Sequence, residues 1–506
     1  MKYFLPILFL LCPSFVFAQD YPLTGHFQNL NEKSIYYNDI STLVRPATGV
    51  ENAIYDSLIF TTVTKSDKSW LNRKLFHEHL VLLEDERFKL LLDPIIDFRL
   101  NSNDLVETGY LNTRGILLSG NLDSKIYFNT SFYENQGIFP MQIYDYYEFY
   151  SVIPGYGRIK PLSRTNEYDF GTAYGNISFR ATENLNFSLG YDRLFIGDGY
   201  RSMILSDFAA PMMYFKTSVK FGKFEYNNIF TKALNPNFNN VMDFDVPTSM
   251  NSRYPSKYIS YNTLTYKLNN WQFSLIEALV MSDNLPNWKV PAYTFSPFFR
   301  TAYIDYKKQL TNNLIGANIT WSNPSIGVFY SQFMLDSWYK NHSPDFALQL
   351  GYKNFDFLNV QNLYFQMEIN YSSDYIYTHP NNELYYGHYN QALAHPAGTN
   401  ISELIILSAY SIKRFELVGK INFYYDYTDS YICSDLRNIG LVIPTRTYIS
   451  GDFLKAEAQL IYNINRANKL QVFCSWDIII NHQVYDTLMF YQLGIRTAIR
   501  SNYYDF

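Results

Sequence analysis

Most of the chain consists of short segments in which apolar and polar residues alternate. The segment NLNFSLGY (184–191) places leucine, phenylalanine and tyrosine on one face and asparagine, serine and glycine on the other. The same pattern recurs in NLYFQMEINY (362–371), FELVGKINFYY (415–425), FLKAEAQLIY (453–462) and KLQVFCSW (469–476). A period of two residues is typical of a β-strand with one apolar face, and about ten residues suffice for a tilted strand to cross a bilayer. We therefore predict membrane-spanning strands whose apolar faces point outward and whose polar faces, including Glu368, Glu416 and Glu457, point inward.

A soluble β-sandwich also alternates, with its apolar face turned inward, so alternation alone leaves both folds open. The C-terminal segment GIRTAIRSNYYDF ends on Phe506, with Tyr504 on the same outward phase, and this ending favours an outer-membrane barrel. Roughly 16 to 19 candidate strands follow residue 88, and bacterial single-chain barrels have an even number. The predicted fold is all-β: a transmembrane antiparallel β-barrel over residues 89–506, with a short N-terminal helical segment before it.

Two segments precede the predicted barrel. Residues 1–18 have the anatomy of a secretory signal peptide, with an early lysine, an apolar run and a small residue at Ala18, after which we expect cleavage. Residues 19–88 form a periplasmic or plug segment, in which 66–86 has helical spacing and Ser66 or Asp67 is placed to cap the helix. Its apolar residues follow one another at steps typical of one helix face: Leu71, Leu75, Phe76, Leu80 and Leu82.

Composition agrees with an exported β protein and argues against other classes. Aromatic residues make up 18% of the chain and charged residues 17%. No apolar run after the signal peptide reaches the roughly 20 residues of a membrane helix. The net charge is −5, whereas a protein that binds nucleic-acid phosphates is expected to carry a basic excess. Cys433 and Cys474 are expected to be unpaired, because Cys474 falls on the outward phase of its strand. We expect no nucleic-acid partner and no cofactor.

The stretch YDRLFIGDGYRS (191–202) places two glycines around an aspartate at the end of an alternating strand. It is not a dinucleotide-binding loop, because a G-x-G-x-x-G motif would need glycine at Ser202. It is not a nucleophile elbow either, because no serine here lies in G-x-S-x-G. We interpret Gly197 and Gly199 as a tight structural turn. Two roles stay open for its charged residues, a structural network of charge pairs and contact with a ligand; these residues are Asp198, Arg201 and Asp207.

Aromatic and histidine-containing segments supply further candidates. The segments 144–150 and 154–160 combine tyrosines with acidic and basic residues, and aromatic rings offer flat faces to sugars. Tyr146, Tyr147 and Arg158 are therefore candidate ligand-binding residues, and an interfacial aromatic belt is the alternative. His77 and His79 would point to different faces of a helix, which argues against a metal site there. His388 and His395 share a loop with Glu383 and are a slightly better metal or sugar candidate, but we expect no metal.

Several motifs resemble those of a known group of outer-membrane proteins. They are NTRG (112–115), FYENQ (132–136), GDGYRSMILSD (197–207) and HPAGTNISEL (395–404). With them, nearly the whole mature chain resembles the capsule assembly Wzi family and, more closely, the RemB-like gliding motility proteins. The resemblance implies a barrel of about 18 strands with a helical bundle at its periplasmic end and folded loops closing the outside. It also implies a surface lectin for exopolysaccharide rather than an open pore.

These observations lead to one expected function and one alternative. We expect a non-enzymatic barrel in the outer membrane of a Gram-negative bacterium, in contact with outer-membrane lipid and a polysaccharide of unknown identity. Its role would be attachment or assembly of capsule or exopolysaccharide, or adhesion and gliding motility, with surface proteins as further partners. The alternative is a porin-like diffusion channel, which would need a continuous aqueous path.

Overall fold

The computed structural model describes most of the chain from residue 69 to 497 and three short stretches before it. The described residues are 33, 36–37, 43–46, 69–103, 108–123, 125–140, 143–144, 146–147, 152–157, 159, 167–235, 255–283, 310–336, 345–379, 381–426, 451–481 and 485–497. The expected signal peptide, Arg158, Cys433 and the C-terminal Phe506 lie outside the described residues. What the sequence predicts for them therefore stays a prediction.

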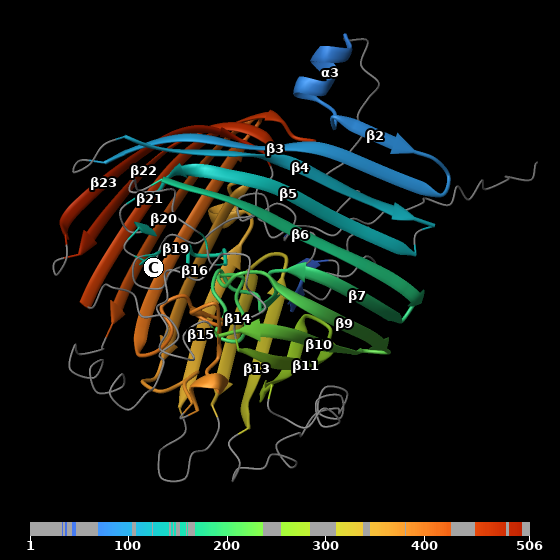
Figure 1. The fold of residues 1–506 in the computed structure, drawn as a ribbon, viewed down its shortest axis with the longest axis vertical. Helices are drawn as coiled ribbons and strands as arrows, with labels where there is room; N and C mark the ends of the chain where they lie inside the picture. The colour runs from blue at the N-terminus through green and yellow to red at the C-terminus, as the bar shows by residue number, and fades with distance from the viewer. Residues whose placement is uncertain are drawn as a thin grey trace, which may run out of the picture.

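Eighteen antiparallel strands of the described chain close into a barrel (Figure 1), which confirms the predicted fold. Consecutive strands of the ring are hydrogen-bonded neighbours, and pairing of the last strand with the first closes it. The ring consists of β3 (Phe88–Asn103), β4 (Gly109–Leu122), β5 (Ile126–Ile138), β6 (Glu167–Thr182), β7 (Leu185–Asp192), β9 (Met212–Phe221), β10 (Phe224–Leu234), β11 (Ser256–Leu268), β12 (Trp271–Ser282), β13 (Thr311–Asn323), β14 (Gly327–Leu335), β15 (Phe346–Asn354), β16 (Leu363–Ser372), β19 (Ile401–Ile412), β20 (Phe415–Asp426), β21 (Gly451–Asn465), β22 (Leu470–Asn481) and β23 (Tyr485–Arg496).

The strands present apolar residues outward, as the alternation predicts. On β16, Met367 and Ile369 are exposed on the outer surface, whereas Glu368 and Asn370 are fully buried on the inner face. A surface of exposed Leu, Ile, Phe and Trp side chains is unfavourable in water and suits the hydrocarbon of a bilayer. Cys474 is a free cysteine, as expected.

No helix in the described part of the chain has the length and hydropathy needed to cross a membrane.

The two ends of the barrel differ in the length of their connections. Connections of two residues, such as 183–184, 222–223 and 269–270, lie at one end, and long segments such as 193–211 and 373–400 leave from the other. Outer-membrane barrels have short periplasmic turns and long extracellular loops. We therefore assign the end with the short turns to the periplasm.

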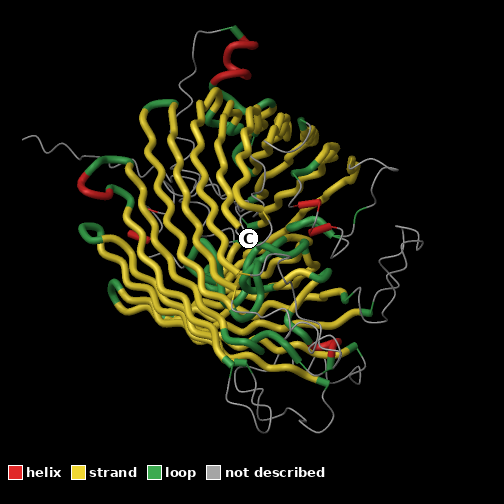
Figure 2. Tube along the Cα trace, turned by 90° about the vertical axis from the view of Figure 1, so that its left-hand side faces the viewer, coloured by secondary structure: helices red, strands yellow, loops and turns green. Residues whose placement is uncertain are grey.

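Two long extracellular segments fold back into the lumen, and we name them the first and second plug loops. The first plug loop, 193–211, contains β8 (Phe195–Ile196), and the second, 373–400, contains β17 (Gly387–His388) and β18 (Gln391–Ala392). Figure 2 shows loop segments inside the ring of strands. Residues of both loops join inward side chains of β9 to β15 in one apolar cluster, including Ile204, Leu205, Leu393, Ile276 and Met334. The prediction that the inward faces of the strands are polar therefore holds only in part, because β9 to β15 also turn apolar side chains inward here.

Described residues near the N-terminus, 33, 36–37 and 43–46, contact the periplasmic end and the same core, and we call them the N-terminal strap. Lys33 pairs with Asp356 beside a periplasmic turn that contains the short helix η3 (Phe357–Asn359). Farther along, β1 (Val44–Arg45) pairs with β8 of the first plug loop, and Leu43 lies in the apolar cluster. Of the predicted periplasmic or plug segment, Tyr36 and residues 43–46 therefore contact the first plug loop inside the barrel, whereas Lys33 lies at its periplasmic rim.

The predicted helix over 66–86 is only partly correct. The helix α3 spans Trp70–Phe76, begins after Ser69 and is followed by strand β2 (Val81–Glu84). The physical reason is an open strand edge: β23 pairs with β3 only from Asp97 onward, and β2 pairs with the part of β3 from Lys89 to Leu92. Backbone hydrogen bonds to this edge outweigh helical spacing over residues 81–84.

Candidate functional site

The turn at Gly197 and Gly199 forms the tip of the first plug loop and lies deep in the lumen. Gly197 has a φ of +146°, and a β-carbon there would lie 2.1 Å from Nε2 of Gln332. A β-carbon at Gly199 would lie 2.5 Å from the carbonyl oxygen of Arg201 and 2.6 Å from a carboxylate oxygen of Glu368. Glycine is needed at both positions because the backbone passes directly against the inner wall.

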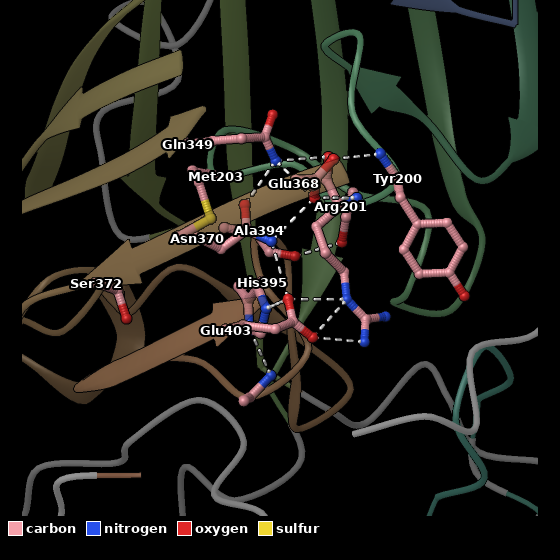
Figure 3. Close-up of polar contacts among 12 residues, drawn as sticks. Tyr200, Arg201, Met203, Gln349, Glu368, Asn370, Ser372, Ala394, His395 and Glu403 are labelled. Carbon is pink, nitrogen blue, oxygen red and sulfur yellow. Dashed lines mark hydrogen bonds and ion pairs between the residues drawn. The ribbon is translucent and has the colours of Figure 1, made fainter. Parts of the chain in front are cut away.

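A buried carboxylate on β16 holds this tip by its backbone. Glu368 accepts hydrogen bonds from the backbone N–H of Tyr200 at 2.7 Å and of Arg201 at 3.0 Å (Figure 3). The hydroxyl of Tyr330 donates to the same carboxylate at 2.7 Å, and Gln349 donates to the carbonyl of Arg201 at 3.1 Å. Fixed donors compensate the lost hydration of this fully buried carboxylate.

The guanidinium of Arg201 pairs with Glu403, the third residue of β19. The distance between Nη2 and Oε1 is 3.0 Å, and both side chains are only 1% exposed. His395 of the second plug loop lies 2.6 Å from the other carboxylate oxygen. Its Nδ1 accepts the backbone N–H of Ala397 at 3.1 Å, so Nε2 carries the proton and donates to Glu403. One carboxylate on the wall thus joins the two plug loops.

The two aspartates of the motif contact other parts of the molecule. Asp198 accepts hydrogen bonds from Tyr36 of the N-terminal strap at 2.9 Å, from Asn318 at 2.9 Å and from Thr320 at 2.5 Å. The carbonyl of Asp207 accepts a bond from Nη1 of Arg193 at 3.2 Å. Both aspartates are buried, and Asp198 connects the strap to the tip of the first plug loop.

The candidate sugar-stacking tyrosines are also buried. Tyr146 packs edge-on against Phe208 of the first plug loop, and Tyr147 packs edge-on against Tyr168 of β6. The structure brings Tyr146 to the first plug loop but leaves neither ring face open to solvent. These rings therefore pack the interior, and stacking on a sugar would require them to move.

The histidine candidates serve as hydrogen-bonding groups. His79 lies 2.5 Å from Asp93, and His388 accepts the backbone N–H of Leu234 at 3.0 Å through Nδ1. Glu383 accepts a hydrogen bond from Ser282 at 2.7 Å. Among the described residues, no group of three or more histidine, cysteine, aspartate and glutamate side chains is arranged to hold a metal ion.

Acidification is expected to loosen the second plug loop through His388. Burial lowers the pKa of His388 to about 3, whereas an unfolded histidine titrates near 6.5. Because only the unfolded chain takes up this proton between these two values, stability falls as the pH drops from about 6.5 toward 3. The unfolding temperature in detergent should therefore decrease over this range, and it should decrease less in His388→Asn, whose amide oxygen can still accept the Leu234 N–H. Equal decreases in both proteins would contradict a role for His388.

Comparison with known proteins finds only solved structures that are distantly similar to the chain. No family model and no curated protein matches the chain. Solved structures with a similar fold include Wzi of Escherichia coli, described as a carbohydrate-binding outer-membrane β-barrel involved in group 1 capsule assembly. It is 12% identical over 81% of this chain and 85% of its own, with a TM-score of 0.49.

Outer-membrane proteins of Pseudomonas aeruginosa are similar at the same level. OccK5 (OpdH) is 9% identical over 81% of this chain and 97% of its own, with a TM-score of 0.42. OpdK, solved with vanillate, is 8% identical over 82% of this chain and 99% of its own, with a TM-score of 0.45. At such identities the likeness concerns the fold alone.

Proposed function

We propose that this chain is a closed outer-membrane barrel that interacts with a surface polysaccharide, in capsule or exopolysaccharide attachment or assembly. The observation that carries the proposal is the packed lumen. Two plug loops and the N-terminal strap meet in one apolar core, and an apolar core excludes the water that a diffusion channel needs. If the lumen is closed, a ligand has to bind at the extracellular end or on the outer surface of the barrel. The motif resemblance to the Wzi family supports a polysaccharide as this ligand.

In this proposal, the buried hydrogen bonds and ion pair around Arg201 have a structural role. Glu403, Glu368 and Asp198 tie the plug loops and the strap to the wall, so the motif GDGYRS keeps the barrel closed rather than contacting the ligand. Burial supports this assignment, because Arg201 and Asp198 are each 1% exposed.

A porin-like channel is the second candidate, and charges on another part of the inner wall favour it. Lys420 pairs with Glu457 at 2.9 Å, and Lys455 lies 3.9 Å from Asp477, on β20, β21 and β22. A charged wall is typical of a lumen that holds water and guides solutes. Conductance separates the two candidates and is treated in the Discussion.

Retention of polysaccharide tests the first candidate directly. Detergent-purified full-length protein is expected to retain polysaccharide from a cell-surface extract of its source bacterium, and heat-unfolded protein is expected to retain none. The measurement is the carbohydrate eluted from the immobilised protein. Equal elution from folded and unfolded protein would contradict the proposal.

A further inference from the structure

Two of the motifs, NTRG and FYENQ, have side chains that point away from the lumen and lie on the outer surface of the barrel. Thr113 and Asn135 point inward and share a hydrogen bond of 2.8 Å. Their neighbours in the sequence point outward: Arg114 is 66% exposed and Glu134 is 52% exposed, with 3.5 Å between their charged groups. Charged side chains on the outer face of a membrane barrel are unfavourable unless they lie at or beyond the membrane interface.

The strand register shows how far this polar character extends. Asn112, Gln136 and Asp169 are paired neighbours on β4, β5 and β6, one step farther from the periplasmic turns than Arg114 and Glu134. Glu167 follows one step farther still and accepts hydrogen bonds from Tyr110 at 2.5 Å and Gln136 at 3.1 Å. We call these six outward residues the outer polar patch: Asn112, Arg114, Glu134, Gln136, Glu167 and Asp169.

The opposite end of the same strands is apolar. Leu122, Ile126 and Phe179 are outward neighbours beside the periplasmic turns, and Ile116 and Phe132 lie just below the outer polar patch. Figure 1 shows β4, β5 and β6 side by side over their length. The change from apolar to polar along these strands places the patch at or beyond the extracellular edge of the hydrocarbon layer.

We infer that the outer polar patch is the surface that binds the polysaccharide, and that the saccharide is neutral and rich in hydroxyl groups. This inference rests on the proposed function. Side-chain amides, carboxylates and a guanidinium together donate and accept hydrogen bonds in directions that sugar hydroxyls can match. The patch carries one cation against three carboxylates. It therefore repels polyanions such as an acidic capsule or the phosphates of a lipid headgroup.

The same observations disfavour a protein as the occupant. Stable protein interfaces have an apolar centre inside a polar rim, whereas the paired Asn112, Gln136 and Asp169 place polar side chains at the centre of this patch. Two copies of the chain packed through it would bring six carboxylates against two arginines, and like charges at an interface are unfavourable.

The test uses surface polysaccharide of the source bacterium, separated by anion exchange into neutral and acidic fractions. Full-length wild-type protein in detergent is expected to bind the neutral fraction. Arg114→Ala, Glu134→Gln and Asp169→Asn are each expected to weaken this binding about tenfold or more. Lys232→Ala is the matched control, because Lys232 is also exposed at the extracellular end of a strand but lies on β10. It should bind like wild type, and all four variants should keep the heat-modifiable gel mobility of an assembled barrel.

Each outcome has a distinct meaning. Binding of neither fraction by wild type overturns the proposed function and this inference together. Binding of the acidic fraction alone leaves the proposed function standing and overturns the inference. Wild-type affinity in the patch variants, or a change in their oligomeric state without loss of binding, also overturns the inference.

Discussion

Arg201→Ala is expected to reduce the yield of assembled barrel severalfold. The substitution leaves Glu403 buried beside His395 and without the guanidinium that lies 3.0 Å away in the native protein. Removing one partner of a buried ion pair costs about 3–5 kcal/mol, a large part of the ~5–15 kcal/mol that stabilises a typical protein. The measurement is the ratio of heat-modifiable to unfolded protein in isolated outer membranes.

Three control variants separate this explanation from a general effect of losing an arginine. Arg114→Ala breaks an exposed ion pair, which contributes no more than ~1 kcal/mol, and should assemble normally. Arg201→Lys keeps the charge but not the planar pair of donors, so its yield should be intermediate. Arg201→Met combined with Glu403→Leu removes both buried charges and should recover much of the yield. Normal assembly of Arg201→Ala alone would mean that this ion pair does not hold the first plug loop.

The barrel wall could be predicted from the sequence because the two faces of a strand are encoded by neighbouring residues. On β16, the exposed Met367 and Ile369 and the buried Glu368 follow the alternation directly. On β12, by contrast, Ile276, Ala278 and Val280 are apolar and point inward. The loss of alternation in SLIEALVM was the available signal that this part of the lumen is a packed core rather than water.

The partners at the candidate site were harder to predict, because they depend on how the loops fold back. The sequence locates a tight turn at Gly197 and Gly199, but Glu403 lies 202 residues beyond Arg201. No local pattern connects these positions, and the nearer carboxylates Asp198 and Asp207 were the obvious candidates. The available signal was the motif HPAGTNISEL, which contains both His395 and Glu403.

Full-length protein in a planar bilayer is expected to show small or intermittent conductance, and a variant without the plug loops is expected to conduct steadily. Both loops leave and return at paired wall positions: Asp192 is the register partner of Met212, and Ser372 of Ile401. Replacing 193–211 and 373–400 by two-residue Asn-Gly turns therefore removes the plug and keeps the strand pairing. A barrel of this size without a plug leaves an aqueous channel.

The loop replacement also tests whether Glu403 needs Arg201 because the plug loops keep water away from its carboxylate. It deletes Arg201 and His395 together with the apolar side chains that keep water from Glu403. A carboxylate that regains its hydration no longer needs a cation, so the double replacement should assemble better than Arg201→Ala despite the larger change.

Steady, large conductance from the unaltered protein would contradict the closed barrel. It would mean that the lumen holds a continuous aqueous path along the charged wall of β20 to β22, and the channel would become the first candidate.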